Sequence, residues 1–273
     1  MNVQATDGEV VACWDEGEGP SIVILHSGLD DGRGYARVAR RLSRQFRVIR
    51  VRRRSYLPDF TGVVSVAAEL GDVSAVADAV GGPMVLVGHS SGGNLALEVL
   101  AALPGRFAGA VLYEPVFVRD LPLLRPDVYR TQCEAFTAGR TRQALVVHLH
   151  EHVGFSPLWS WLLARVAAAV PSYRGLIRGM VVLDAAAIDA AGDRRADYRA
   201  IAAPVLLVGG SCSPAVLKDS LDELESLLGA SARVTMRGQG HCANLFRPGK
   251  LAAIIEQFAD RCVRLDSSQT ADS

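Results

Sequence analysis

The chain has 273 residues, 49% of them hydrophobic, and 29 lysine and arginine residues balance 29 aspartate and glutamate residues. A chain of this length and composition can bury a large core, so we expect one compact domain with an elaboration. The zero net charge argues against nucleic acid or an anionic membrane surface as the main partner and favours a small molecule.

The start of the chain lacks the basic residues and the apolar run of a secretory signal, and no later segment has about 20 consecutive apolar residues. We therefore expect a cytoplasmic protein with no membrane partner. Its oligomeric state stays open. Five widely spaced cysteines include no Cys-x-x-Cys pair, which indicates free thiols.

Short β-rich runs open the chain, and strands then alternate with helices. Strands are expected at 10–14, 21–25, 46–51, 84–87, 109–113, 204–208 and 233–236, and helices at 35–42, 63–80, 95–103, 213–228 and 250–258. Because several strand runs are apolar throughout, the sequence predicts an α/β fold with a mostly parallel central sheet flanked by helices.

The alternation stops in the middle of the chain. Helical patterns without a convincing strand occupy 117–203, so we expect a helical cap inserted there, with core residues 1–116 and 204–264. Residues 265–273 are polar and are expected to be a disordered tail.

One stretch of the chain is strongly basic. From Arg33 to Arg54 there are ten arginines and no carboxylate. The first interpretation is a solvated helix face followed by a loop. The alternative is an attraction for an anionic substrate or a carrier-bound acyl group.

The expected strand at 84–87 ends at Gly88-His89-Ser90-Ser91-Gly92. A Gly-x-Ser-x-Gly sequence between a strand and a helix places the serine on a sharp turn, and the glycines leave room for close backbone approach. A serine hydroxyl in this setting acts as a nucleophile once a base removes its proton. Ser90 is therefore the candidate nucleophile.

Together with Leu25-His26-Ser27-Gly28 and Gly238-Gln239-Gly240-His241, this motif gives the chain a resemblance to the α/β-hydrolase superfamily, in its serine-nucleophile, esterase- and thioesterase-like branch. The resemblance covers nearly the whole chain and implies the order nucleophile, acid, histidine. It makes His241 the general base. His89 and His26 are then expected to give structural support, beneath the turn and at the oxyanion loop respectively.

The triad acid, unlike the serine and the histidine, is not marked by a local motif. The loop where the family usually carries it, 209–214, contains no carboxylate. Some members carry the acid after the preceding core strand, a position that Glu114 holds here, so Glu114 is the preferred acid. A strand-end carboxylate held by backbone donors is the alternative role. Asp219, Asp222, or a water or polar group near Cys212 are the competing candidates.

The resemblance also implies an oxyanion hole made of backbone N–H groups. The matching residues are Gly28 and Ser91. Leu29 replaces Gly28 if the loop is shifted by one residue. Ser27 stands where the family usually has glycine, which leaves the shape of this loop open.

The expected cap contains three closely spaced histidines, a pattern that could suggest a metal site. Of His148, His150 and His152, only the first and last share a helix face, and two histidines make an incomplete metal site. We therefore expect no metal and no organic cofactor, and a cap helix with partly exposed histidines. The aromatic residues of the same insert could line an apolar pocket or pack within the cap; they are Phe155, Trp159, Trp161 and Tyr173.

The sequence favours a serine-dependent hydrolase that cleaves a carboxylic ester or thioester of an apolar acyl compound through an acyl-enzyme on Ser90. The cap would set substrate choice. The first alternative is a non-hydrolytic enzyme of the same fold that catalyses elimination, cyclisation or acyl transfer. The second is a catalytically silent receptor. Epoxide hydrolysis and dehalogenation are excluded because they need an aspartate nucleophile.

Overall fold

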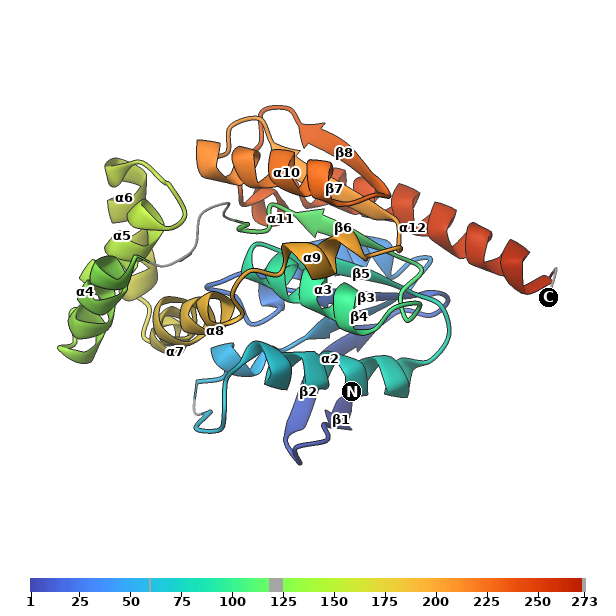
Figure 1. Ribbon diagram of the computed structural model, residues 1–273. Coiled ribbons are helices and arrows are strands. Elements are labelled where there is room, and N and C mark those ends of the chain that lie inside the picture. Colours follow the sequence, from blue (N-terminus) through green and yellow to red (C-terminus); the bar gives the residue numbers. More distant parts are fainter. Residues whose placement is uncertain (59, 118–124, 272–273) are drawn as a thin grey trace.

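The computed structural model describes residues 1–58, 60–117 and 125–271. Eight strands form one sheet in the order β1-β2-β4-β3-β5-β6-β7-β8 (Figure 1). The strands are β1 (Asn2–Gln4), β2 (Val10–Glu16), β3 (Ser21–Leu25), β4 (Arg47–Val51), β5 (Met84–His89), β6 (Gly109–Tyr113), β7 (Val205–Gly210) and β8 (Ser231–Met236). β2 pairs antiparallel with β1 and β4, and the pairings from β4 through β8 are parallel. The predicted mostly parallel sheet is confirmed.

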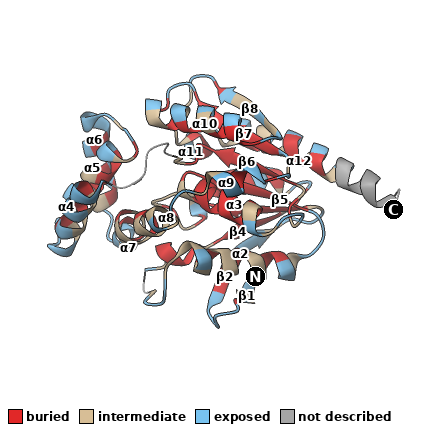
Figure 2. Ribbon diagram, viewed as in Figure 1, coloured by how far each residue is buried: buried red, intermediate tan, exposed pale blue. Residues whose placement is uncertain are grey.

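Helices cover both faces of the sheet (Figure 1). One face packs against α2 (Val66–Val80), α3 (Ser91–Ala102) and α10 (Ala215–Leu227), and the other against α1 (Ala36–Leu42) and α12 (Pro248–Ala271). Every residue of β3, β5, β6 and β7 is buried, as Figure 2 shows for the centre of the molecule. Double-sided burial explains why these strands are continuous apolar runs.

The register of the sheet places the site. His89 at the end of β5 pairs with Tyr113 at the end of β6, and Tyr113 pairs with Val208 of β7. Because parallel strands finish at the same edge, the residues that follow β5, β6 and β7 emerge side by side.

Between β6 and β7 the described residues form helices and no strand. They are α4 (Pro126–Thr137), α5 (Thr141–Glu151), α6 (Pro157–Ala168), α7 (Tyr173–Arg178), the π-helical segment η3 (Gly179–Asp184), α8 (Ala185–Ala190) and α9 (Arg195–Arg199). α4 to α7 and η3 share a small apolar core of their own, and Figure 1 shows α4 to α6 standing to one side of the sheet. The division into core and cap at 117–203 stays a prediction, and residues 118–124 lie outside the described residues.

Two terminal segments differ from expectation. β1 pairs with the edge strand β2, although Asn2-Val3-Gln4 is too short and polar to show a strand pattern. α12 continues to Ala271, beyond residue 265 where we expected disorder to begin, and residues 272–273 lie outside the described chain. A helix nucleated by packed residues extends into the following ones at little cost. None of the described helices has the length and apolar character needed to cross a membrane.

Candidate active site

Ser90 occupies the sharp turn between β5 and α3. Its backbone has φ 54° and ψ −124°, and its N–H donates to the carbonyl oxygen of Tyr113 at 2.9 Å. Gly92 permits the close approach behind it, because a Cβ there would lie 2.3 Å from the carbonyl oxygen of Leu25. The glycine therefore lets α3 begin directly against the end of β3, with Ser90 at the tip of the turn.

His241 and Glu114 come together from loops that are far apart in the chain. Nδ1 of His241, in the loop after β8, lies 2.6 Å from Oε2 of Glu114, the first residue after β6. This contact occupies Nδ1 and leaves Nε2 as the free ring nitrogen. His241 and Ser90 line the same cavity, so Nε2 is the atom able to exchange a proton there.

The loop after β7 explains how the side chain of Glu114 is held next to His241. Oε1 of Glu114 accepts hydrogen bonds from the Gly210 N–H at 2.6 Å and from the Ser213 hydroxyl. The loop at 209–214 contains no carboxylate of its own, but it donates two hydrogen bonds to the carboxylate of Glu114. These donors hold the buried side chain in place beside His241.

The competing acids lie elsewhere. Asp219 and Asp222 are exposed on α10, and Asp222 forms an ion pair with Arg233. Cys212 is also exposed. The structure therefore brings His241 together with Glu114 and with neither aspartate.

Backbone strain concentrates at this edge of the sheet. Within the described chain, the non-glycine residues with left-handed backbone are Leu29 (φ 56°), Ser90 (φ 54°) and Glu114 (φ 45°). Such conformations cost about 1–3 kcal/mol each and tend to cluster at functional sites. All three belong to the candidate site.

His89 supports the loop that carries His241. Its Nε2 lies 3.0 Å from the carbonyl oxygen of His241, and its ring stacks on Tyr113 with centroids 4.4 Å apart. The Tyr113 hydroxyl donates to the Gly240 carbonyl and accepts from the Ala243 N–H. Burial lowers the pKa of His89, so the ring is neutral. These contacts tie His89 to the loop that carries His241, and the two ring centroids lie 4.8 Å apart.

The loop after β3 is anchored by His26. Its Nε2 accepts the Arg53 N–H at 3.3 Å, which leaves Nδ1 protonated to donate to the Ser27 carbonyl at 2.9 Å. Burial lowers the pKa of His26 and keeps it neutral. The fixed ring therefore holds the start of the loop that contains Gly28.

Three backbone N–H groups are available near Ser90. Those of Gly28 and Leu29 donate no backbone hydrogen bond within the part of the chain that the structure describes. Ser91 begins α3, where a first-turn N–H has no helical partner. All three residues line the cavity that contains Ser90, so they are the candidate oxyanion donors.

The cavity has a volume of about 840 Å³ and lies between the sheet edge and the inserted helices. Pockets of about 300–1,000 Å³ hold drug-sized ligands. The inserted helices contribute a mostly apolar wall, which includes Leu149, Val153, Phe155, Leu162, Val166 and Met180. Phe155 lies 6.4 Å from His241 between ring centroids.

The remaining cap candidates divide between cavity and surface. Phe155 and Tyr173 line the cavity, whereas Trp159 and Trp161 are exposed on α6. His148 also lines the cavity and is buried, contrary to the expected exposure, and burial lowers its pKa to about 3. The described residues contain no group of three or more side chains placed to hold a metal ion.

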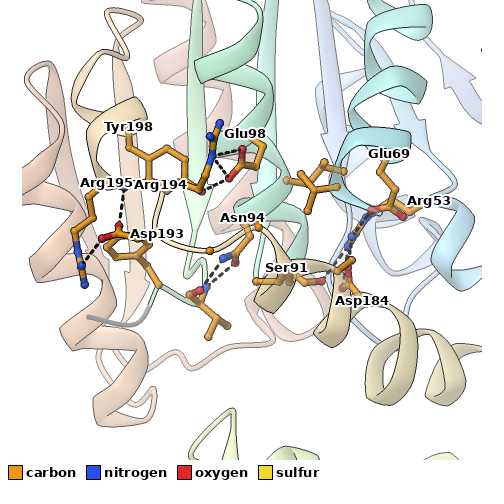
Figure 3. Close-up of a pocket in the computed structure, with 18 residues that line it drawn as sticks. Arg53, Glu69, Ser91, Asn94, Glu98, Asp184, Asp193, Arg194, Arg195 and Tyr198 are labelled. Carbon is orange, nitrogen blue, oxygen red and sulfur yellow. Dashed lines mark hydrogen bonds and ion pairs between the residues drawn. The ribbon is translucent and has the colours of Figure 1, made fainter. Parts of the chain in front are cut away.

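The arginine-rich stretch is exposed along α1, at Arg37, Arg40 and Arg41, as expected, and sequence reasoning misjudged only its later part. Arg50, Arg53 and Arg54 are buried, with exposed fractions of 7%, 3% and 4%, so a solvated face is the wrong description of them. Arg53 lies between Glu69 and Asp184, as Figure 3 shows. These carboxylates are distant in sequence and gave no local signal of the pairing.

Comparisons with known proteins agree with this fold. A family model described as the alpha/beta hydrolase family matches residues 22–254. Lipase LipV of Mycobacterium tuberculosis is 28% identical over 211 residues, which cover 70% of this chain and 74% of the lipase. An alpha/beta hydrolase from Sphaerobacter thermophilus has a TM-score of 0.80 at 26% identity, over 94% of this chain and 99% of that one. The esterase EaEST from Exiguobacterium antarcticum has a TM-score of 0.75 at 18% identity, over 95% and 99% of the two chains, and shares the fold.

Proposed function

The chain belongs to the alpha/beta hydrolase family, and on that premise we propose that it is a serine-dependent hydrolase of carboxylic esters or thioesters. The observation that carries the proposal is the 2.6 Å contact between His241 and Glu114 beside a serine on a strained strand-to-helix turn. A base oriented in this way can activate the serine hydroxyl.

In the proposed reaction, Nε2 of His241 takes the proton of the Ser90 hydroxyl as Oγ attacks the substrate carbonyl. The backbone N–H groups of Ser91 and Gly28, or of Leu29, stabilise the resulting oxyanion. His241 then gives its proton to the leaving alcohol or thiol. A water molecule, deprotonated by His241, attacks the acyl-enzyme, and the proton returns to Ser90 as the acid departs. Glu114 holds the tautomer of His241 and stabilises its charged form.

The wall of the cavity supports an apolar acyl compound as substrate. Leucine, valine and phenylalanine side chains of the inserted helices face the space above Ser90, and burying an acyl chain against them is favourable by about 25 cal/mol per Å². The similarity to a protein named as a lipase agrees with this class.

The non-hydrolytic alternative has less support than the sequence alone gave it. It drew weight from the missing carboxylate at 209–214, and the contact of Glu114 with His241 gives another account of that loop. The receptor alternative predicts a protein without turnover.

The test is steady-state hydrolysis of p-nitrophenyl esters of increasing acyl length. Ser90→Ala and His241→Ala should each abolish turnover while the thermal unfolding midpoint stays close to that of the wild type. Ser226→Ala, at an exposed serine in the last turn of α10, is the control and should match the wild type. Unchanged turnover in Ser90→Ala would contradict the proposed function.

A further inference from the structure

A group of buried polar side chains lies directly behind the oxyanion side of the site. We call it the Asp184 cluster, and it consists of Arg53, Tyr56, Glu69, Ser91 and Asp184. The side chains of Arg53, Glu69 and Asp184 are each at least 95% buried. Figure 3 shows Arg53 reaching both carboxylates beside Ser91. Buried charges are expensive unless they are paired, so the fold holds this arrangement firmly.

The contacts of the cluster converge on the side chain of Ser91. Nη1 of Arg53 donates to Oγ of Ser91 at 3.0 Å, and the Tyr56 hydroxyl lies 3.4 Å from the same oxygen. The Tyr56 hydroxyl also donates to Oδ2 of Asp184 at 2.5 Å, and Nη2 of Arg53 forms an ion pair with Oδ1 of Asp184. Asp184 therefore fixes both groups that hold Ser91.

The charge of Asp184 is maintained despite its burial. Desolvation alone would raise the pKa of this carboxyl, but the charge of Arg53 and hydrogen bonds from Ser91, Tyr56 and Arg53 outweigh it and lower the pKa. Asp184 is thus a carboxylate at neutral pH.

Asp184 comes from the inserted helices, whereas the rest of the cluster belongs to the α/β core. It ends the π-helical segment η3, a rare conformation that is frequent at functional sites. The same segment approaches the core closely, because a Cβ on Gly179 would lie 2.4 Å from the Ser55 carbonyl oxygen. A Cβ on Gly28 would lie 2.8 Å from Sδ of Met180. This segment therefore lies against Gly28 through Met180 and is linked to Ser91 through Arg53 and Tyr56.

We infer that Asp184 is a positioning residue through which the cap sets the oxyanion hole. By holding Arg53 and Tyr56, it fixes the Ser91 side chain and so the direction of the Ser91 N–H. The inference rests on the proposed function. It couples acyl transfer to docking of η3 on the core, because without Asp184 the groups that restrain Ser91 are no longer aligned.

The chain offers a matched pair of variants. Arg53 pairs with Asp184 and Glu69, and the neighbouring Arg54 pairs with Asp72 and Asp7. Asp184→Asn and Asp72→Asn each neutralise one buried carboxylate and leave the arginine a second one. Of the two aspartates, only Asp184 has partners that also contact Ser91. A general loss of packing or stability affects both variants, whereas loss of positioning affects the first alone.

We expect Asp184→Asn to lower kcat for p-nitrophenyl acetate at least about tenfold while KM changes less than about twofold, since an oxyanion donor acts on the transition state. The Ki of an alkyl trifluoromethyl ketone, whose adduct with Ser90 carries an oxyanion, should rise by a similar factor. Tyr56→Phe should show a smaller effect in the same direction, and Asp184→Glu should recover part of the loss. Asp72→Asn should keep the wild-type kcat and Ki.

Equal kcat and Ki in Asp184→Asn and the wild type would overturn the inference, as would an equal loss in Asp72→Asn. If Asp184→Asn does not fold, Ser91→Ala decides, because it keeps the backbone N–H and removes the restrained hydroxyl; wild-type kcat and Ki there would overturn the inference. Fluorophosphonate labelling of the wild type judges the proposed function separately. Labelling at Ser90 together with an unaltered Asp184→Asn contradicts the inference alone, and no labelling contradicts both.

Discussion

At the scale of single residues, Glu114 is the proposed triad acid, and it follows a different strand from the one that usually precedes this residue in the family. Glu114 follows β6, yet its carboxylate reaches His241 with one oxygen and two donors of the β7 loop with the other. The sequence identified Ser90 and His241 from local motifs. For Glu114 it left alternatives open, because its partners Gly210 and His241 lie 96 and 127 positions further along the chain.

Glu114→Gln tests this assignment. The amide keeps the size of the side chain but cannot stabilise a charged His241, so we expect kcat to fall by about 10³–10⁴. The measurement is p-nitrophenyl acetate hydrolysis under saturating substrate. Ser213→Ala removes one donor to Glu114 and retains the carboxylate, so its loss should be far smaller. Turnover close to the wild-type rate in Glu114→Gln would remove Glu114 from the triad.

At the scale of elements, the sequence predicted what repeats locally and missed what pairs at a distance. The buried strands and the turn at Ser90 carry apolar runs and glycines, which are visible in a short window. The ion pairs of Arg53 and Arg54 join the end of β4 to α2, and Arg53 also to the cap, so ten arginines without a nearby carboxylate suggested a solvated face. The partner carboxylates are present in the sequence but lie far from these arginines along the chain.

Two helical glycines give opposite predictions for the same substitution. A Cβ on Gly92 would lie 2.3 Å from the Leu25 carbonyl oxygen and 2.4 Å from that of His26, and backbone atoms cannot move aside easily. Gly92→Ala should therefore lower the free energy of unfolding by about 2 kcal/mol or more and reduce turnover by displacing Ser90.

Gly71, inside α2, is the control, because the nearest atom to a Cβ there is 3.9 Å away. Gly71→Ala should raise the free energy of unfolding by about 0.5–1 kcal/mol with unchanged kcat, since alanine is the better helix former. Urea denaturation of both variants is the measurement. A stable, active Gly92→Ala would contradict the close packing of α3 on β3.

At the scale of the whole molecule, buried neutral histidines make stability depend on pH. Burial lowers the pKa of His26, His89 and His148 below the ordinary value, for His148 to about 3. Between the folded pKa and about 6.5 the unfolded chain binds more protons than the folded one, so stability falls as pH falls through this window. Each histidine contributes about 1.4 kcal/mol per pH unit there.

The prediction is a free energy of unfolding that drops steadily from pH 6.5 to 5, measured by urea denaturation at a series of pH values. His148→Phe removes one such group and should make the slope shallower by about 1.4 kcal/mol per pH unit. His150→Gln, on the exposed side of the same helix, should leave the slope unchanged. An identical slope in His148→Phe would contradict the burial of that imidazole.

The central claim is that Ser90 is the nucleophile of the site. Its most direct measurement is peptide-resolved mass spectrometry after treatment with an alkyl fluorophosphonate, comparing the wild type with Ser90→Ala. The account predicts one phosphonyl adduct on Ser90, loss of ester turnover in step with labelling, and no adduct in the variant. Ester turnover by a wild type that takes no adduct at Ser90, or an equal adduct in Ser90→Ala, would contradict it.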